Sequence, residues 1–231
     1  MSGALRNSPG RDGHSRKLAV ALRLTEIFYS LQGEASRVGL PTVFVRLTGC
    51  PLRCVWCDTE YSFTGGEPAT IESVLAEVGK YPARQVCVTG GEPLSQKECL
   101  PLLQALCDAG YEVSLETSGA LDIAAVDPRV ARIMDLKAPD SGEVARNRWE
   151  NLALLNARDE IKIVIASRAD YQWAREVLRE RSLASLCPVL FSPAQGRVEP
   201  ADLAAWILED GLEVRFQLQL HKLLWGNMKG K

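Results

Sequence analysis

The chain has little net charge, few histidines and no long hydrophobic run. Its 231 residues carry a formal net charge of −2 and two histidines, His14 and His221. Nearly balanced charge gives no reason to expect nucleic acid or a membrane surface as a partner. No segment approaches the ~20 apolar residues that a membrane helix requires, and the apolar run 18–22 is too short for a signal-peptide core. We therefore expect a cytoplasmic protein.

The seven cysteines are an odd number for a disulfide framework, and a chain of this length does not need one. We expect reduced thiols. The polar, basic segment 1–17 is predicted to be a flexible N-terminal extension, and residues 18–231 a single domain. We find no internal repeat or linker.

Short apolar runs alternate with amphipathic segments after residue 17. Strands are predicted over 22–28, 42–47, 85–89, 112–116, 132–136, 160–165, 189–191 and 213–218. Helices are predicted over 71–78, 97–109, 168–181 and 201–210. The alternation predicts an α/β fold with mostly parallel strands, arranged as a partial barrel. Ligands then bind at the carboxyl ends of the strands.

Three cysteines, Cys50, Cys54 and Cys57, follow the predicted strand 42–47 at the spacing C-x3-C-x2-C. Fe–S clusters are normally held by four thiolates, so three can hold a cubane cluster and leave one iron open for another ligand. The alternative is a zinc site, which would need a fourth Cys or His. None lies between Cys57 and Cys87. The other four cysteines lie in strand or helix patterns and are predicted to be core residues.

A second motif, Thr89-Gly90-Gly91-Glu92-Pro93, follows the next strand. Two glycines allow the backbone to approach a ligand closely, although the segment alone is also compatible with an ordinary strand-to-helix turn. Together with the cysteine loop, it resembles the radical S-adenosylmethionine (SAM) superfamily. In that superfamily the open iron binds SAM, and the glycine-rich segment holds its methionine amino group.

Further segments narrow the resemblance. They are Glu26-Ile27-Phe28-Tyr29-Ser30-Leu31-Gln32-Gly33-Glu34, Phe44-Val45-Arg46-Leu47, Asp58-Thr59 and Gln219-Leu220-His221-Lys222. This combination is similar to the 7-carboxy-7-deazaguanine synthase family of queuosine biosynthesis. The family usually has a glycine after Gln-Gly-Glu, where this chain has Ala35.

The resemblance implies a lyase with a [4Fe–4S] cluster on Cys50, Cys54 and Cys57, SAM and Mg²⁺. The implied reaction is a radical ring contraction of 6-carboxy-5,6,7,8-tetrahydropterin to 7-carboxy-7-deazaguanine, with loss of ammonia. An external flavodoxin- or ferredoxin-like electron donor and a homodimer are also implied.

Individual site residues follow from the same resemblance. Thr59 matches a magnesium ligand. The implied substrate contacts are Leu31, Gln32, Gly33, Arg46, Thr89 and His221. The implied SAM contacts are Trp56, Cys57, Asp58, Gly91, Glu116, Asp135, Leu136, Lys137, Ser192, Pro193, Ala194 and Gln195.

Two alternatives remain open from the sequence. An activase of a glycyl-radical enzyme would share the cysteine loop and Thr-Gly-Gly-Glu-Pro, but it need not carry the Gln-Gly-Glu segment or the terminal His-Lys. A non-catalytic iron–sulfur or zinc-binding protein is the other. Metal content separates the second from an enzyme, and a substrate assay separates the first.

Overall fold

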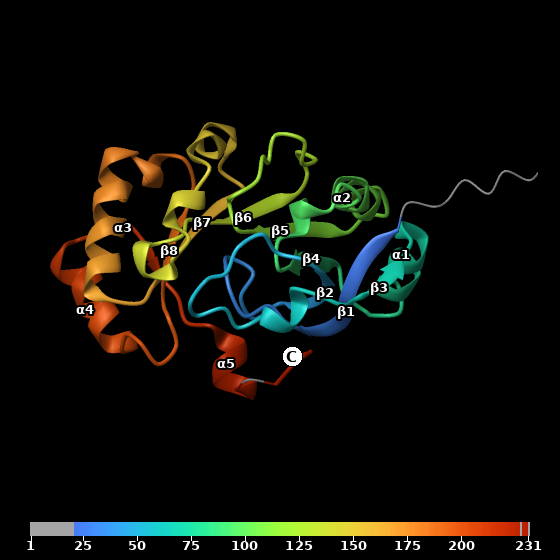
Figure 1. Ribbon diagram of the computed structural model, residues 1–231, viewed down its shortest axis with the longest axis horizontal. Coiled ribbons are helices and arrows are strands. Elements are labelled where there is room, and N and C mark those ends of the chain that lie inside the picture. The colour runs from blue at the N-terminus through green and yellow to red at the C-terminus, as the bar shows by residue number, and fades with distance from the viewer. Residues whose placement is uncertain (1–20, 227, 231) are drawn as a thin grey trace, which may run out of the picture.

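The apolar strands join into one nine-stranded sheet in the computed structural model, which describes residues 21–226 and 228–230 (Figure 1). The predicted extension 1–17 lies outside the described residues. The strands are β1 (Leu22–Leu31), β2 (Pro41–Leu47), β3 (Glu67–Ala69), β4 (Gln85–Gly90), β5 (Glu112–Thr117), β6 (Ala131–Asp135), β7 (Glu160–Ile165), β8 (Val189–Pro193) and β9 (Arg215–Phe216).

The sheet order is β3-β1-β2-β4-β5-β6-β7-β8-β9, and every pair from β2 to β9 is parallel. Among the strands of the described residues, only β1 pairs antiparallel, with β2 on one side and β3 on the other. The sheet therefore has two edges, at β3 and β9, and is open. The predicted α/β fold with mostly parallel strands is confirmed, and the antiparallel edge is an addition to it.

Of the five α-helices in the described residues, four match the predicted ones closely. They are α1 (Ile71–Val78), α2 (Cys99–Asp108), α3 (Arg168–Glu180) and α4 (Pro200–Glu209), and the fifth is α5 (Leu220–Trp225). Local chemistry sets their starts: the side chain of Thr70 caps α1 through the N–H of Ser73, and Ser167 caps α3 through the N–H of Asp170. Proline stands at the first position of α4.

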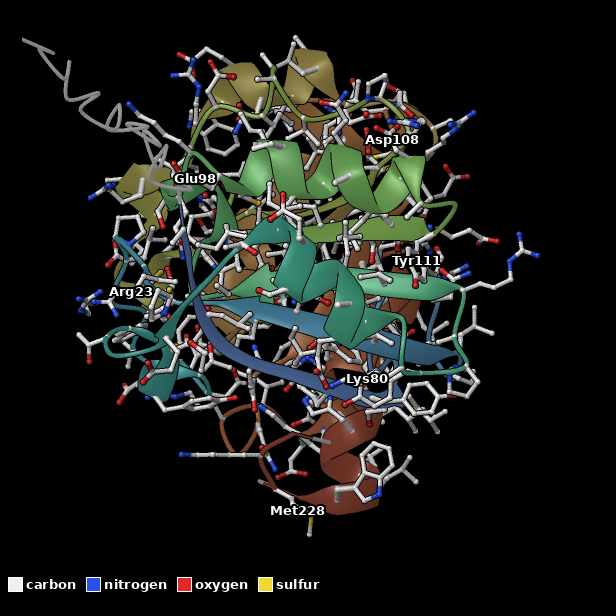
Figure 2. The ribbon with its side chains drawn as sticks, turned by 90° about the vertical axis from the view of Figure 1, so that its right-hand side faces the viewer. Arg23, Lys80, Glu98, Asp108, Tyr111 and Met228 are labelled. Carbon is white, nitrogen blue, oxygen red and sulfur yellow. The ribbon has the colours of Figure 1, made fainter. Side chains whose placement is uncertain are left out.

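The core lies between the sheet and helices α1–α4, where Val, Ile and Leu side chains from parallel strands are fully buried. Figure 2 shows α2, between the labelled Glu98 and Asp108, lying across this side of the sheet, with Met228 at the far end of the molecule. In Figure 1, α5 and the C-terminal segment lie apart from α1–α4. No helix in the described part of the chain is long and apolar enough to cross a membrane.

The connection between β1 and β2 reaches distant strands. The N–H of Ser36 donates to the carboxylate of Glu160 in β7 (3.0 Å), and the N–H of Ala35 donates to Oε1 of Gln217 (2.6 Å). Ala35 is 3% exposed and has a φ of 63°. This is left-handed backbone that glycine adopts without cost, so the departure at Ala35 falls at a position where glycine would be favoured.

Candidate active site

A cavity of about 670 Å³ lies at the carboxyl ends of the parallel strands. Its walls come from the ends of β2, β4, β5 and β6, from the loop after β2, and from α5 with the residues that follow it. Loops after successive parallel strands converge at this edge of a sheet. The cavity thus lies where the predicted ligand-binding motifs meet.

The loop after β2 brings the three predicted cluster cysteines to this cavity. Cys50, Cys54 and Cys57 line it, and each is half-buried and free of a disulfide. Burial raises the pKa of the Cys50 and Cys54 thiols. Such thiols lose their protons when a metal binds. Three of them at one wall of a polar cavity suit an iron–sulfur cluster that keeps one iron open.

The remaining cysteines lie away from this loop. Cys87, Cys99 and Cys187 are buried, and Cys107 is partly buried in α2. Burial raises the pKa of Cys187 to about 12. Their predicted place in the core is confirmed for the three buried cysteines.

The glycines of the Thr89–Pro93 segment allow it to pack on the cysteine loop. A Cβ on Gly90 would lie 2.4 Å from the carbonyl oxygen of Leu47, and one on Gly91 would lie 2.5 Å from that of Gly49. The N–H of Glu92 also donates to the carbonyl of Gly49 (2.8 Å). Close backbone contact therefore fixes the glycine-rich segment against the residues that lead into Cys50.

The carboxylate of Glu92 ties the same segment to the end of β5. Glu92 is fully buried. It accepts hydrogen bonds from the N–H of Leu94 (2.9 Å), from the hydroxyl of Thr117 (2.9 Å), and from both the N–H (2.6 Å) and the hydroxyl of Ser118. Thr117 and Ser118 line the cavity. Glu92 therefore connects the Thr89–Pro93 segment to the end of β5 through hydrogen bonds on the side away from the cavity.

Two predicted substrate contacts meet at the carboxylate of a predicted SAM contact. Glu116 accepts hydrogen bonds from the hydroxyl of Thr89 (2.9 Å) and from the side-chain amide of Gln32 (3.4 Å). All three side chains line the cavity. Glu116 was predicted as a SAM contact, whereas Thr89 and Gln32 were predicted as substrate contacts. Together they offer the donors and acceptors that the edge of a heterocycle needs.

Arg46 presents a cation to the cavity from the end of β2. Its Nε donates to Oε1 of Glu26 (2.7 Å), and its side chain is 13% exposed. Within the described part of the chain its two terminal nitrogens have no hydrogen-bond partner. A planar carboxylate could therefore bind the guanidinium from the cavity side.

A network of buried charges forms another wall. Nζ of Lys162 lies 2.6 Å from Glu34 and 3.7 Å from Asp135, and Nζ of Lys137 lies 2.9 Å from Asp135. Burial lowers the pKa of Lys162, but Asp135 and Glu34 together raise it well above its ordinary value. Burial raises the pKa of Asp135, but Lys137 and Lys162 lower it below its usual range. Asp135 and Lys162 thus stabilise each other's charged forms, and Oδ1 of Asp135 is buried without a partner among the described residues.

Helix α5 closes the cavity from the opposite side. Nζ of Lys222 lies 2.9 Å from Asp58, and this ammonium lowers the pKa of Asp58 although burial would raise it. The N–H of Leu220 donates to the carbonyl of Gly33 (2.9 Å). A Cβ on Gly33 would lie 2.2 Å from Nδ1 of His221. Burial lowers the pKa of His221, so its ring is neutral near pH 7.

The predicted magnesium ligand Thr59 lines the cavity beside the cysteines. Its Oγ1 lies 3.7 Å from Sγ of Cys57. No three His, Cys, Asp or Glu side chains in residues 21–226 and 228–230, the loop cysteines included, are grouped closely enough to hold a single metal ion. An iron–sulfur cluster differs, because each thiolate binds a different iron. Mg²⁺ keeps several waters and takes oxygens from substrates, so a single hydroxyl is compatible with a site completed by substrate.

Most of the predicted site residues line this one cavity. Those that do are Leu31, Gln32, Gly33, Arg46, Cys50, Cys54, Trp56, Cys57, Asp58, Thr59, Thr89, Gly91, Glu116, Asp135, Lys137, Ala194, Gln195 and His221. Leu136, Ser192 and Pro193 are not among its lining residues and are buried. Leu136, the first residue after β6, packs in the core, whereas Asp135 and Lys137 on either side of it line the cavity.

Several side chains at the site were given no role in the sequence analysis. Glu34, Tyr61, Lys162, Arg197 and Lys222 line the cavity, as do residues 228–230 near the C-terminus. Lys222 was visible as part of the terminal His-Lys pair. Lys162 lies in an apolar strand, and a charged residue there is a usable signal for a paired or functional group.

Comparisons with known proteins agree with the geometry. The family model described as "Radical SAM superfamily" matches residues 44–179. A 7-carboxy-7-deazaguanine synthase from Koribacter versatilis is 47% identical over 219 residues, which cover 88% of this chain and 97% of that protein. One from Chlorobaculum tepidum is 48% identical over 207 residues, 88% of this chain and 94% of that protein. The crystal structure of QueE from Escherichia coli superposes with a TM-score of 0.73 at 25% identity, over 87% of this chain and 95% of that chain.

Proposed function

The chain belongs to the 7-carboxy-7-deazaguanine synthase family of the radical SAM superfamily, and from this premise we propose its reaction and the residues that serve it. The proposed reaction converts 6-carboxy-5,6,7,8-tetrahydropterin to 7-carboxy-7-deazaguanine with release of ammonia. The supporting observation is that one cavity is lined by both the three cysteines and Arg46, whose two terminal nitrogens have no hydrogen-bond partner among the described residues.

The cofactors of the superfamily supply the step that the protein cannot perform alone. A [4Fe–4S] cluster with SAM supplies one-electron reductive chemistry that starts a radical reaction. Cys50, Cys54 and Cys57 would hold the cluster. Gly91 lies directly beside Cys50 and would present its backbone to the amino acid part of SAM. Asp135 and Lys137 would bind SAM from the end of β6.

The protein residues would bind and orient the pterin and exclude water. Gln32 and Thr89 would hydrogen-bond to the ring, and Arg46 would bind its carboxylate. Glu116, which accepts hydrogen bonds from Gln32 and Thr89, would contact SAM. His221 would contact the substrate as a neutral ring from α5. Thr59 would take part in Mg²⁺ binding, with the substrate supplying further oxygens.

The test is an anaerobic assay of reconstituted protein with SAM, a reductant and 6-carboxy-5,6,7,8-tetrahydropterin, with the product identified by mass. We expect 7-carboxy-7-deazaguanine from the wild-type protein and none from Cys54→Ala. The matched control is Cys107→Ala in α2, which should keep full iron content and activity. SAM cleavage without deazaguanine product would reject this substrate and leave the activase alternative, and zinc in place of iron would reject the enzyme.

Thr59→Ala tests the magnesium proposal separately. We expect the iron content to stay at the wild-type value and the stimulation by Mg²⁺ to be lost. An unchanged response to Mg²⁺ would remove Thr59 from the metal site.

Partners and location are part of the same proposal. A flavodoxin- or ferredoxin-like protein would supply the electron, two chains would form a homodimer, and the enzyme would work in the cytoplasm, where its thiols stay reduced. Mass measurement of the reconstituted protein in solution would test the homodimer directly.

A further inference from the structure

Glu26 is a charged residue in the middle of β1, and none of the roles above uses it. The pairing of β1 with β2 is regular from Glu26 opposite Arg46 to Leu31 opposite Pro41. Side chains alternate along a strand, so Glu26 lies on the same face of the sheet as Phe28 and Arg46. The register shifts only on the N-terminal side of Glu26, between Leu24 and Glu26.

The pairing with Arg46 places the carboxylate of Glu26 between two donors. Its Oε1 accepts a hydrogen bond from Nε of Arg46 (2.7 Å) and another from the hydroxyl of Tyr61 (2.8 Å). Burial and the Glu26 carboxylate raise the pKa of Tyr61 to about 12, although Arg46 lowers it, so the phenol stays a donor at neutral pH. One oxygen therefore fixes both an arginine from β2 and a tyrosine from the cysteine loop.

Aromatic rings hold the same guanidinium on its sides. Its carbon Cζ lies 5.6 Å from the ring centre of Phe28 and 5.8 Å from that of Tyr61. The ring of Phe28 stacks on Phe44 with centroids 4.8 Å apart and planes within 7°. Phe28, Phe44, Arg46 and Tyr61 all line the cavity. Cation–π contacts at this distance orient a guanidinium as well as stabilise it.

The guanidinium is planar and has five N–H donors in a rigid fork. When Nε is occupied by Glu26, the donors that remain belong to the two terminal nitrogens. That pair of nitrogens is a bidentate site for a carboxylate. Without a partner at Nε, the long side chain of arginine could rotate and present a different edge.

We propose that Glu26 is a positioning residue, which holds Nε of Arg46 so that both terminal nitrogens face the cavity and select a carboxylated pterin. This inference rests on the proposed function, because Arg46 is the residue proposed to bind the substrate carboxylate. Glu26 acts through hydrogen-bond geometry, since its negative charge by itself would oppose the binding of a second carboxylate nearby.

Three substitutions separate geometry from charge. Glu26→Gln keeps an oxygen acceptor for Arg46 and Tyr61 and removes the charge. Glu26→Asp keeps the charge but is one methylene shorter, so it withdraws the acceptor from Nε. Glu26→Ala removes both. Each variant is reconstituted, and its iron content and circular dichroism are compared with those of the wild-type protein before kinetics.

The measurements are KM and kcat for 6-carboxy-5,6,7,8-tetrahydropterin, and the inhibition constant of tetrahydropterin without the carboxylate. For Glu26→Asp and Glu26→Ala we expect KM to rise about tenfold and kcat to change by less than about twofold, because ground-state carboxylate binding is lost. We expect Glu26→Gln to remain within about twofold of the wild-type protein in both constants. The inhibition constant of the carboxylate-free pterin should be the same in all variants that fold.

A wild-type KM for Glu26→Asp, or a KM for Glu26→Gln as high as that of Glu26→Asp, would overturn the positioning role. If Glu26→Ala does not fold, the Asp and Gln variants still decide the question. Failure of the parent proposal gives a different result. In that case the wild-type protein itself binds the carboxylated and carboxylate-free pterins equally.

Discussion

Substitution of Glu92 should destabilise the protein more than any substitution of an exposed glutamate. Four donors converge on its carboxylate: the N–H of Leu94, the hydroxyl of Thr117, and the N–H and hydroxyl of Ser118. In Glu92→Ala each loses its partner inside the protein, at roughly 1–3 kcal/mol per group. Removal of the buried charge also removes a desolvation cost of several kcal/mol that opposes folding. We therefore expect a net loss of about 3 kcal/mol in the free energy of unfolding.

Glu92→Gln should lie between the wild-type protein and Glu92→Ala. The amide keeps an acceptor for Leu94 and Thr117 but turns a second N–H donor towards the N–H of Ser118. One buried donor is then unpaired, and we expect a loss of about 1–2 kcal/mol. The exposed Glu180 of α3 provides the control, since Glu180→Gln should change stability by less than about 0.5 kcal/mol.

Urea unfolding of the metal-free, reduced protein, followed by circular dichroism, measures these differences. With an m value of about 3 kcal/mol/M, a loss of 3 kcal/mol lowers the midpoint by about 1 M. Glu92→Ala should also bind SAM more weakly after reconstitution, because Thr117 and Ser118 lose their support at the cavity wall. A midpoint for Glu92→Ala equal to that of the Glu180→Gln control would refute the argument.

Three further predictions concern Tyr61, Ala35 and Asp159. The phenolate absorbance of wild-type protein minus Tyr61→Phe should titrate near pH 12 rather than near 10, because burial raises this pKa to about 12. The contribution of the protonated Tyr61 phenol to the free energy of unfolding is present below pH ~10 and is lost as pH rises towards 12. A titration midpoint near 10 would contradict this raised pKa. Ala35→Gly should change the free energy of unfolding, measured by calorimetry, by less than about 1 kcal/mol, since relief of left-handed strain offsets the lost methyl burial. Ala35→Val should lower it by more than about 2 kcal/mol. Asp159→Ala should cost about 3–5 kcal/mol in thermal unfolding, because it leaves Arg132 buried and unpaired; a loss under about 1 kcal/mol would show that the pair is hydrated.

The parallel core was predictable because its strands are continuous apolar runs buried on both faces. β3 was not, since Glu67-Pro68-Ala69 is three residues long and contains proline. Helix α5 was missed for a similar reason. It has six residues, no side-chain cap and two exposed leucines, Leu223 and Leu224, so its place depends on tertiary contacts rather than on local signals.

The candidate site likewise contains residues that could be predicted from the sequence and residues that could not. The cysteines and the Thr-Gly-Gly-Glu-Pro segment are contiguous in sequence, and their spacing carries information about chemistry. The pairing of Lys162 with Glu34 joins residues 128 positions apart, and no local pattern reports it. Glu26 shows the same limit, because alternation places it on the face of Phe28, but its partner Arg46 depends on the register between β1 and β2, which no local pattern sets.

The connection between β1 and β2 makes ligand binding a property of the whole chain. Ser36 and Glu160 are 124 positions apart, and Ala35 and Gln217 are 182 apart. Contacts of such separation form late in folding, because long loops must close first. A fragment ending before β7 would contain all three cysteines and the glycine-rich segment, yet it would lack the strand and the glutamine that hold Ala35 and Ser36. Cluster assembly and substrate recognition should therefore be separable in time: a nascent chain can present its thiols well before it can recognise a pterin.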